Sequence, residues 1–187
     1  MGLRVVRPAT EEDLSGITRI YERYVLHSCA TFELEPPGQE EMRQRRAEIL
    51  RLGLPYLAAE VDGAVAGFAY AHPYRPRGAY RFTVEDSIYV DAGHLGQGHG
   101  QALLAGVIAG CEQGSWRQMI AVIGDSGNVA SIGLHQRLGF RPVGTLSAVG
   151  FKFGRWVDSV LMQRELHGEP PLSTTAMIQA CEGEARR

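Results

Sequence analysis

The chain has 187 residues, of which 44% are hydrophobic and 21% are charged, and its formal net charge is −2. This size and composition predict one soluble globular domain with a full core. A slightly acidic chain lacks the basic surface that attracts nucleic acid or an anionic membrane, so neither is expected as a partner.

The cysteines and the apolar runs favour a cytoplasmic location. Cys29, Cys111 and Cys181 show no CxxC pairing, which is unlike a disulfide scaffold, so the thiols are expected to be reduced. No apolar run approaches eighteen residues, and the first residues lead directly into sequence typical of a folded domain. We therefore expect neither a transmembrane helix nor a signal peptide.

The first half of the chain predicts a strand, two helices and a β-hairpin. Leu3–Arg7 has strand length, and Thr10–Asp13 resembles a capping box that opens a helix. A second helix is predicted from about Glu40 to Leu52, after a loop. The pair Asp62-Gly63 is a strong two-residue hairpin signal, and it joins predicted strands at Tyr56–Val61 and Ala64–His72.

A strand, a glycine-rich turn and a helix follow in that order. The strand Arg81–Val90 carries Glu85 near its middle and leads to Gly96-Gln97-Gly98-His99-Gly100. Apolar residues beyond the glycines recur at three- and four-residue spacing, which predicts a helix. Free N–H groups at such a helix start favour an anion. The spacing fits neither a Rossmann loop nor a P-loop, and a loop that only has to be tight is the alternative.

The last part of the chain predicts a strand, a helix and a strand pair. Met119–Ile123 is an apolar run of strand length, and Asn128 can cap a helix that ends at Gly139. Arg141–Val149 and Trp156–Glu165 are predicted to pair. This order predicts an α+β or mixed α/β fold with the glycine loop at the centre of one sheet. Residues 168–187 show no sustained periodicity and are expected to be a flexible tail, which leaves 1–167 as a single domain.

Two motifs in this sequence are similar to those of the GCN5-related N-acetyltransferases, the GNAT superfamily. Leu95–Gly100 resembles the family loop Arg/Gln-x-x-Gly-x-Gly/Ala, with Leu95 where Arg or Gln is frequent. Asn128, Ser131, His135 and Gly139-Phe140 match a second motif, in which His135 stands in the place of a tyrosine. The resemblance implies a mixed, mostly antiparallel sheet of about six to seven strands, flanked by helices and splayed at an acetyl-CoA site.

Four longer blocks resemble one branch of that superfamily, the phosphinothricin and methionine sulfone/sulfoximine acetyltransferases. They are ATFE at 30–33, TVEDSIYV at 83–90, LHQRLGF at 134–140 and VGFKFGRWVD at 149–158. The resemblance covers Arg4 to Leu166. It implies acetyl transfer from acetyl-CoA to the α-amino group of a small amino acid by direct attack, and a homodimer with 149–158 at or near its interface.

The candidate catalytic residues are Glu85 and His135. A carboxylate in this strand can attract an ammonium group and accept its proton, whereas the alternative for Glu85 is an ordinary surface charge. His135 matches the family tyrosine that protonates the departing thiolate, and its alternative is a half-buried polar residue of a helix. Asp86 points to the opposite face of the strand and is interpreted as structural.

The resemblance also implies two sets of binding residues. Those for acetyl-CoA are Ile88, Tyr89, Val90, Leu95, Gly96, Gln97, Gly98, His99, Gly100, Asn128 and Ser131. Those for the acceptor are Thr31, Phe32, Tyr74, Arg75, Thr83, Val84 and Lys152. Among the latter, the Arg75 guanidinium suits the carboxylate of an amino acid, which it can bind bidentately.

Two other functions remain open from the sequence. Leu95 and His135, which depart from the family pattern, favour a non-catalytic acyl-CoA sensor on the same fold. The acceptor could alternatively be a protein N-terminus, a polyamine or an aminoglycoside. No metal is expected, because His27, His72 and His94 are scattered without ligand spacing.

Overall fold

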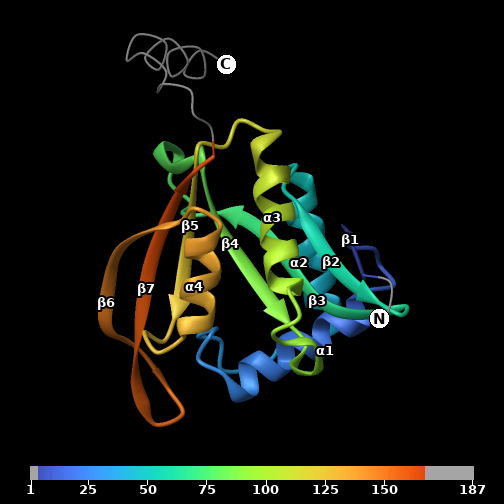
Figure 1. Ribbon diagram of the computed structural model, residues 1–187, viewed down its shortest axis with the longest axis horizontal. Helices are drawn as coiled ribbons and strands as arrows, with labels where there is room; N and C mark the ends of the chain where they lie inside the picture. The colour runs from blue at the N-terminus through green and yellow to red at the C-terminus, as the bar shows by residue number, and fades with distance from the viewer. Residues whose placement is uncertain (1–3, 167–187) are drawn as a thin grey trace.

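The computed structural model describes residues 4–166, which form one seven-stranded sheet with helices on both faces (Figure 1). The predicted tail at 168–187 and Cys181 lie outside the described residues. The strands are β1 Arg4–Pro8, β2 Tyr56–Val61, β3 Ala64–Pro73, β4 Thr83–Val90, β5 Gln118–Gly124, β6 Arg141–Lys152 and β7 Arg155–Glu165. The helices are α1 Leu14–His27, α2 Gln39–Arg51, α3 His99–Glu112 and α4 Val129–Arg137, with short 3₁₀ turns η1 Gly78–Tyr80 and η2 Ala92–His94.

The sheet opens between its two central strands. The strand order is β1-β2-β3-β4-β5-β7-β6, and every neighbouring pair is antiparallel except β4 with β5. The parallel pairing of β4 with β5 covers Thr83–Asp86 against Gln118–Ala121 and goes no further. Val90 ends β4 and Gly124 ends β5 without facing one another in the ladder. The predicted mixed, mostly antiparallel and splayed sheet is confirmed.

The two faces of the sheet are covered by different helices. α1 and α2 pack on one face, where the rings of Tyr21, Phe68 and Tyr89 lie against one another with centroids 4.9 to 6.4 Å apart. α3 packs on the other face through buried aliphatic side chains such as Leu103 and Leu104, and α4 lies beside it (Figure 1). Alternation along β4 therefore sends successive side chains to different helices.

Local signals place several of the turns as predicted. Asp62 and Gly63 both have positive φ, 51° and 81°, which is the backbone of a two-residue hairpin. The predicted capping box at Thr10–Asp13 is wrong in position: the Thr10 N–H donates to the Asp13 carboxylate at 2.7 Å, but α1 begins at Leu14 with Asp13 as its N-cap. Asp13 also binds Arg7 at 2.7 Å, so that this carboxylate ties β1 to the start of α1.

Two strand boundaries differ from the sequence expectation. β4 begins at Thr83 and not at Arg81, because the preceding residues form the 3₁₀ turn η1. β6 runs on from the predicted end at Val149 to Lys152, where Phe153 and Gly154 turn the chain with φ of 51° and 72°. Irregularities in the β6–β7 register at Pro142/Gly144 and Leu146/Gly150 let β6 bend and continue to this turn.

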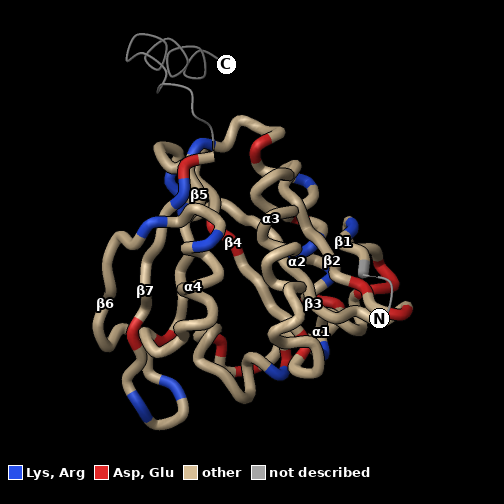
Figure 2. Tube along the Cα trace, viewed as in Figure 1, with Lys and Arg blue, Asp and Glu red and all other residues tan. Residues whose placement is uncertain are grey.

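Charged residues run along the length of α2, and Lys152 and Arg155 lie at the tip of the β6–β7 hairpin (Figure 2). None of the helices within residues 4–166 is long and apolar enough to span a membrane.

Candidate active site

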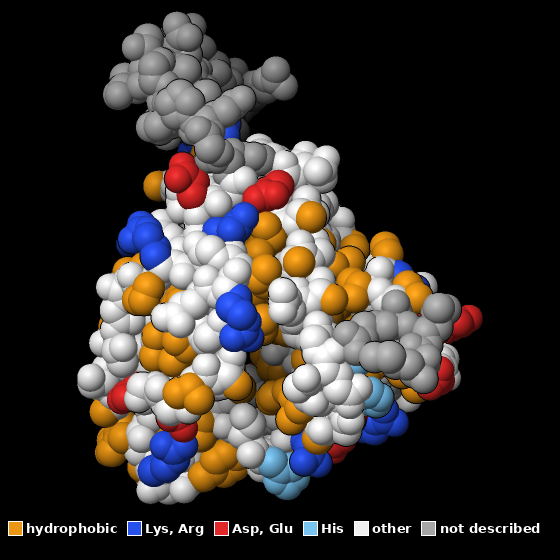
Figure 3. All heavy atoms as spheres, in the orientation of Figure 1, with side chains coloured by type: hydrophobic (Ala, Val, Ile, Leu, Met, Phe, Trp, Pro, Cys, Tyr) orange, Lys and Arg blue, Asp and Glu red, His pale blue; other side chains and the backbone are white. Residues whose placement is uncertain are grey.

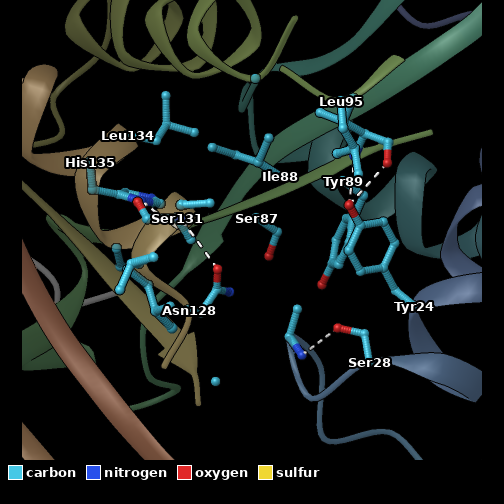
Figure 4. A pocket seen from close by; sticks show the side chains of 18 of the residues that line it. Tyr24, Ser28, Ser87, Ile88, Tyr89, Leu95, Asn128, Ser131, Leu134 and His135 are labelled. Atoms are coloured by element: carbon cyan, nitrogen blue, oxygen red, sulfur yellow. Dashed lines mark hydrogen bonds between the residues drawn. The ribbon is translucent and has the colours of Figure 1, made fainter. Parts of the chain in front are cut away.

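The opening between β4 and β5 leads into a cavity of about 860 Å³. Its walls are the outer half of β4, the glycine-rich turn with the start of α3, the first turns of α4, and residues 28–30 after α1. Figure 3 shows a hollow between α3 and α4 that is bordered by hydrophobic side chains. Figure 4 shows Asn128, Ser131 and His135 on one side of the cavity, Ile88 in the middle, and Tyr24 with Leu95 on the other.

The backbone of β4 faces this opening at alternate residues. The Asp91 N–H donates to Ala66 O at 2.9 Å, and alternation in an antiparallel ladder then directs the amides of Ile88 and Val90 away from β3. At Val90 the Tyr24 hydroxyl already donates to the carbonyl at 2.9 Å and accepts from the N–H at 3.3 Å. Ile88 is therefore the position from which β4 can offer a backbone donor to a ligand.

The glycine-rich turn presents the start of α3 to the cavity. Gly96 and Gly98 have φ of 70° and 86°, a left-handed backbone that glycine adopts without strain, and Gly98 is the N-cap of α3. Leu95, Gly96, Gly98, His99 and Gly100 line the cavity. A helix start with open N–H groups suits the phosphates of a nucleotide.

The side chains of Gln97 and Tyr89, both predicted to bind the cofactor, make contacts within the protein. The Gln97 amide donates to Gly93 O at 3.1 Å, and its residue is absent from the cavity wall. The Tyr89 side chain packs against Tyr21 and Tyr24 on the α1 face, and the residue lines the cavity.

The start of α4 forms the facing wall. Asn128 caps the helix, because its Oδ1 accepts the Ser131 N–H at 3.2 Å, as its position in the sequence predicts. The Asn128 amide N–H₂ is not used by this cap. Ser131 Oγ lies 3.4 Å from His135 Nδ1 and also lines the cavity.

His135 is paired with Asp86, a contact that the sequence did not reveal. His135 Nε2 lies 3.0 Å from Asp86 Oδ2, and Nδ1 lies 2.7 Å from the Ser131 carbonyl oxygen. The two side chains are only 4% and 2% exposed. Burial lowers the pKa of His135, but the hydrogen bond and charge of Asp86 and the Ser131 carbonyl outweigh burial and raise this pKa above its ordinary value.

Glu85 lies on the opposite face of β4 from Asp86, as strand alternation predicts. Its side chain is 22% exposed, and its Oε1 lies 3.8 Å from His72 Nε2. Burial, and to a smaller extent the charge of Asp86, raises the pKa of Glu85 to about 7, while the charge of Arg75 acts in the opposite direction. A carboxylate with this pKa can both accept and release a proton near neutral pH.

The predicted acceptor residues form two groups. Arg75 lies in the β3–β4 connection, with its guanidinium 5.1 Å from the Tyr74 ring and 5.9 Å from the Tyr80 ring, and its charge reaches Glu85. Phe32 is 40% exposed in the loop between α1 and α2. Thr83 begins β4, and its carbonyl accepts the Tyr74 N–H at 3.1 Å. Val84 has a fully buried side chain within the hydrophobic core, so only its backbone can reach a ligand.

Thr31 and Lys152 are bound to other parts of the chain. Lys152 Nζ donates to Ser28 O and Thr31 O, both at 2.8 Å, and burial lowers the pKa of this amine. Thr31 Oγ1 lies 3.2 Å from the Tyr21 hydroxyl and accepts the Glu33 N–H. The β6–β7 hairpin is thereby fixed to the loop that carries Phe32.

Gly150 lets the hairpin approach that loop closely. A Cβ at this position would lie 2.4 Å from the Phe32 ring, which is closer than non-bonded atoms can be. Within residues 4–166, no group of three or more His, Cys, Asp or Glu side chains is arranged to hold a metal ion.

Comparison with known protein families and structures supplies independent findings. The model of the acetyltransferase (GNAT) family matches residues 19–140. A phosphinothricin N-acetyltransferase of Alcaligenes faecalis is 56% identical over 162 residues, which cover 87% of this chain and 82% of the relative. An L-methionine sulfoximine/L-methionine sulfone acetyltransferase of Salmonella typhimurium is 36% identical over 167 residues, covering 88% and 97% of the two chains.

A solved structure has the same architecture. It is a GNAT superfamily phosphinothricin acetyltransferase from Sinorhizobium meliloti in complex with acetyl-CoA. The TM-score is 0.86 at 44% sequence identity, and the match covers 91% of this chain and 94% of the other.

Proposed function

The chain belongs to the GNAT family of acetyltransferases and uses acetyl-CoA, and from this premise we propose its acceptor. We propose that it acetylates the α-amino group of a small amino acid with a tetrahedral, oxygen-bearing side chain, such as phosphinothricin, methionine sulfone or methionine sulfoximine. The relatives with those activities, at 56% and 36% identity, support this acceptor class. The observation that carries the proposal is the desolvated Glu85 carboxyl within range of the Arg75 charge.

Glu85 acts as the general base in this proposal. An α-ammonium group must lose a proton before its nitrogen can attack, and a neighbouring carboxylate whose pKa is about 7 accepts that proton at neutral pH. Arg75 acts on the other charged group of the acceptor, since a guanidinium binds a carboxylate bidentately. The two residues together select a molecule that carries an amine and a carboxylate close to one another.

The cavity between β4 and β5 accommodates acetyl-CoA. In this proposal the Ile88 N–H donates to the acetyl carbonyl, and this donor stabilises the negative charge that forms on the oxygen during attack. The glycine-rich turn and the N-terminus of α3 take the pyrophosphate. Asn128 and Ser131 complete the wall across the opening. His135, the predicted proton donor to the leaving thiolate, is hydrogen-bonded through both ring nitrogens within the protein and offers no proton there.

Phe32, Tyr74 and the backbone of Thr83 are the proposed walls of the acceptor site. Thr31 and Lys152 contribute through the loop they fix, because their polar atoms already bind within the protein. We assign them to positioning Phe32.

The proposed assembly is a homodimer through the β6–β7 hairpin. β6 lies at the edge of the sheet, and apolar side chains along 149–158 are open to solvent, among them Phe151 at 56% and Trp156 at 65% exposure. An apolar patch of this kind is typical of an interface. Sedimentation equilibrium at micromolar concentration should give twice the 20.5 kDa chain mass, and a clean monomer would contradict the dimer.

We also propose that the protein is cytoplasmic. The buried free thiols Cys29 and Cys111 suit a reducing compartment. Cell fractionation with an antibody against the chain tests this location.

The proposed acceptor class is tested by thiol release from acetyl-CoA across a panel of amines. The panel comprises phosphinothricin, methionine sulfone, methionine sulfoximine, methionine, spermidine, kanamycin and a peptide with a free N-terminus. We expect turnover with the first three and values of kcat/KM lower by about 10-fold or more for the others. Preference for spermidine, kanamycin or the peptide would overturn the acceptor class. Binding of acetyl-CoA without turnover of any amine would favour the sensor function.

A further inference from the structure

The outer half of β4 has no partner strand on its β5 side. Pairing with β5 ends at Asp86, opposite Ala121. If the same register continued, Ile88 would face Ile123, and its backbone groups would be used in the ladder. Unpaired edges of two neighbouring strands tend to pair with one another. The open sheet therefore needs groups that satisfy these two edges and keep them apart.

Tyr24 of α1 satisfies the edge of β4 at Val90. The Tyr24 hydroxyl donates to Val90 O at 2.9 Å and accepts the Val90 N–H at 3.3 Å. These are the two backbone groups that a neighbouring strand would bind at one residue. Burial raises the pKa of Tyr24, so the hydroxyl keeps at neutral pH the proton that it donates. One side chain of α1 thus takes the place of β5 at this position.

The Tyr24 side chain contacts β4 and the cavity together. It is half-buried and lines the cavity, and its ring packs edge-on against Tyr89 with the centroids 5.0 Å apart. Figure 4 shows Tyr24 across the cavity from Ser131. The ring and the hydroxyl therefore hold Tyr89 and Val90, which are the two residues that follow Ile88 in β4.

The loop that follows α1 covers the edge of β5. The Ser28 N–H donates to Tyr24 O at 3.1 Å and ends the helix, and the next two residues line the cavity. Gly124 lets this loop cross the end of β5, because a Cβ at that position would overlap the Cys29 carbonyl oxygen. Lys152 Nζ fixes the same loop by donating to Ser28 O at 2.8 Å. The end of α1 and its loop therefore stand between the two open edges.

We propose that Tyr24 is a positioning residue of the acetyl-CoA site, whose hydroxyl holds the open end of β4 so that the Ile88 N–H stays free for the acetyl carbonyl. The contact of Ile88 with that carbonyl rests on the proposed function. Tyr24 keeps both of its bonds to Val90 and gives none to the ligand. A donor to a developing oxyanion is sensitive to a displacement of about 1 Å, so loosening Val90, two residues away, weakens this contact.

The first test is amide hydrogen exchange in the protein without ligand. In ¹⁵N-labelled wild type, the protection factor of the Val90 amide should exceed that of the Ile88 amide by about 10-fold or more, because Val90 is bonded to Tyr24. Tyr24→Phe keeps the ring and removes the hydroxyl, and it should lower the Val90 protection factor by a similar ratio.

Equal protection of Val90 and Ile88 in the wild type, or unchanged Val90 protection in Tyr24→Phe, overturns the inference. The wild-type comparison decides the point even if the variant does not fold.

The second test compares acetyl-CoA with CoA, which has no acetyl carbonyl. In calorimetry, Tyr24→Phe should raise the Kd for acetyl-CoA by about 5-fold or more and the Kd for CoA by less than about twofold. A merely structural loss would weaken both ligands alike. An unchanged Kd for acetyl-CoA, or an equal loss for the two ligands, contradicts the positioning of Ile88.

Tyr56→Phe is the matched control. Tyr56 is a buried tyrosine of β2 whose hydroxyl has no hydrogen-bond partner among the described residues, and it does not line the cavity. This variant should leave both Kd values and the Val90 protection factor unchanged. A change equal to that of Tyr24→Phe would show that the loss of any buried hydroxyl has the same effect, which overturns the specific role of Tyr24.

Neither test uses an acceptor, so an error in the acceptor class leaves both results intact. In the wild type, acetyl-CoA should protect the Ile88 amide more than CoA does. Equal protection by the two ligands would contradict the Ile88 contact of the proposed function, whereas a failure confined to Tyr24→Phe contradicts the role of Tyr24.

Discussion

Two adjacent carboxylates on β4 have the same chemistry and opposite surroundings. Asp86 is hydrogen-bonded to a histidine and is nearly inaccessible to solvent. Glu85 has only the imidazole of His72 at 3.8 Å and makes no side-chain hydrogen bond within residues 4–166. One step along a strand moves a side chain from the α4 face of the sheet to the α1 face.

Because of this difference Asp86 is part of an ion pair, whereas Glu85 can exchange a proton near neutral pH. An ion pair stabilises the charged form of each partner, whereas desolvation without an ion-paired cation favours the neutral form of a carboxyl. Opposed environments for two nearby titratable groups are a common way to assign base and acid in one active site. On this basis Glu85 is the proposed base of the reaction, and the buried Asp86–His135 pair is a fixed pair of charges.

Glu85→Gln is expected to have the largest effect on kcat/KM, because glutamine cannot accept the proton of the substrate amine. The variant should lower kcat/KM by about 10²- to 10⁴-fold and leave the Kd for acetyl-CoA nearly unchanged. The acidic limb near pH 7 in the wild-type profile should disappear. Steady-state kinetics from pH 5.5 to 9, with calorimetry for the cofactor, measures both. Retained turnover would exclude Glu85 as the base.

The two carboxylates should also affect stability in opposite directions. The pKa of Glu85 is about 7 in the folded protein and near 4.5 when unfolded, so the wild type loses stability as pH rises between these values. Glu85→Gln should therefore raise the free energy of unfolding at pH 8 by about 1–3 kcal/mol. Urea unfolding measures this gain, and destabilisation at pH 8 would contradict it.

Asp86→Asn should instead lower the free energy of unfolding by about 2–4 kcal/mol, because it leaves a buried imidazole without its anion. The raised pKa of His135 means that the pair stabilises the fold below the ordinary histidine pKa. This stabilisation is lost as pH rises through the folded pKa. The deficit of the variant should consequently be larger at pH 6 than at pH 9 in the same urea experiments.

Arg75→Ala tests what sets the pKa of Glu85, because the charge of Arg75 lowers that pKa. The acidic limb of kcat/KM should move to higher pH. KM should rise by about 10- to 50-fold for a free amino acid and much less for its methyl ester, which has no carboxylate to bind. Equal changes for acid and ester would show that Arg75 does not bind the carboxylate.

His72→Gln should give the smallest effect. Burial lowers the pKa of His72, so the ring is neutral at pH 7 and does not act on Glu85 as a cation. We expect kcat/KM to change about threefold or less. A loss comparable to that of Glu85→Gln would mean that His72 takes part in the proton transfer.

Local chemistry made much of the fold predictable. The Asp62-Gly63 turn, the glycines before α3 and the Asn128 cap each depend on the backbone or side chain of a few adjacent residues. The alternation that separates Glu85 from Asp86 is equally local. These local signals predicted the glycine-rich turn and the starts of α3 and α4, which line the candidate site.

Contacts between distant segments could not be predicted in the same way. Asp86 and His135 are 49 positions apart, and Lys152 and Thr31 are 121 positions apart. No local sequence pattern around either residue of such a pair identifies its partner. The pKa of Glu85 likewise depends on how β3, β4 and the residues around Arg75 exclude water, which only the packed structure defines.

The absence of a side chain at Gly150 makes this position a control point for the choice of acceptor. With Phe32 as the proposed acceptor wall, a single methyl group at position 150 must displace that wall. The hairpin contributes neither the base nor the proton donor. A substitution in this hairpin can therefore change which amino acid fits the proposed acceptor site and leave Glu85 of β4 unaltered.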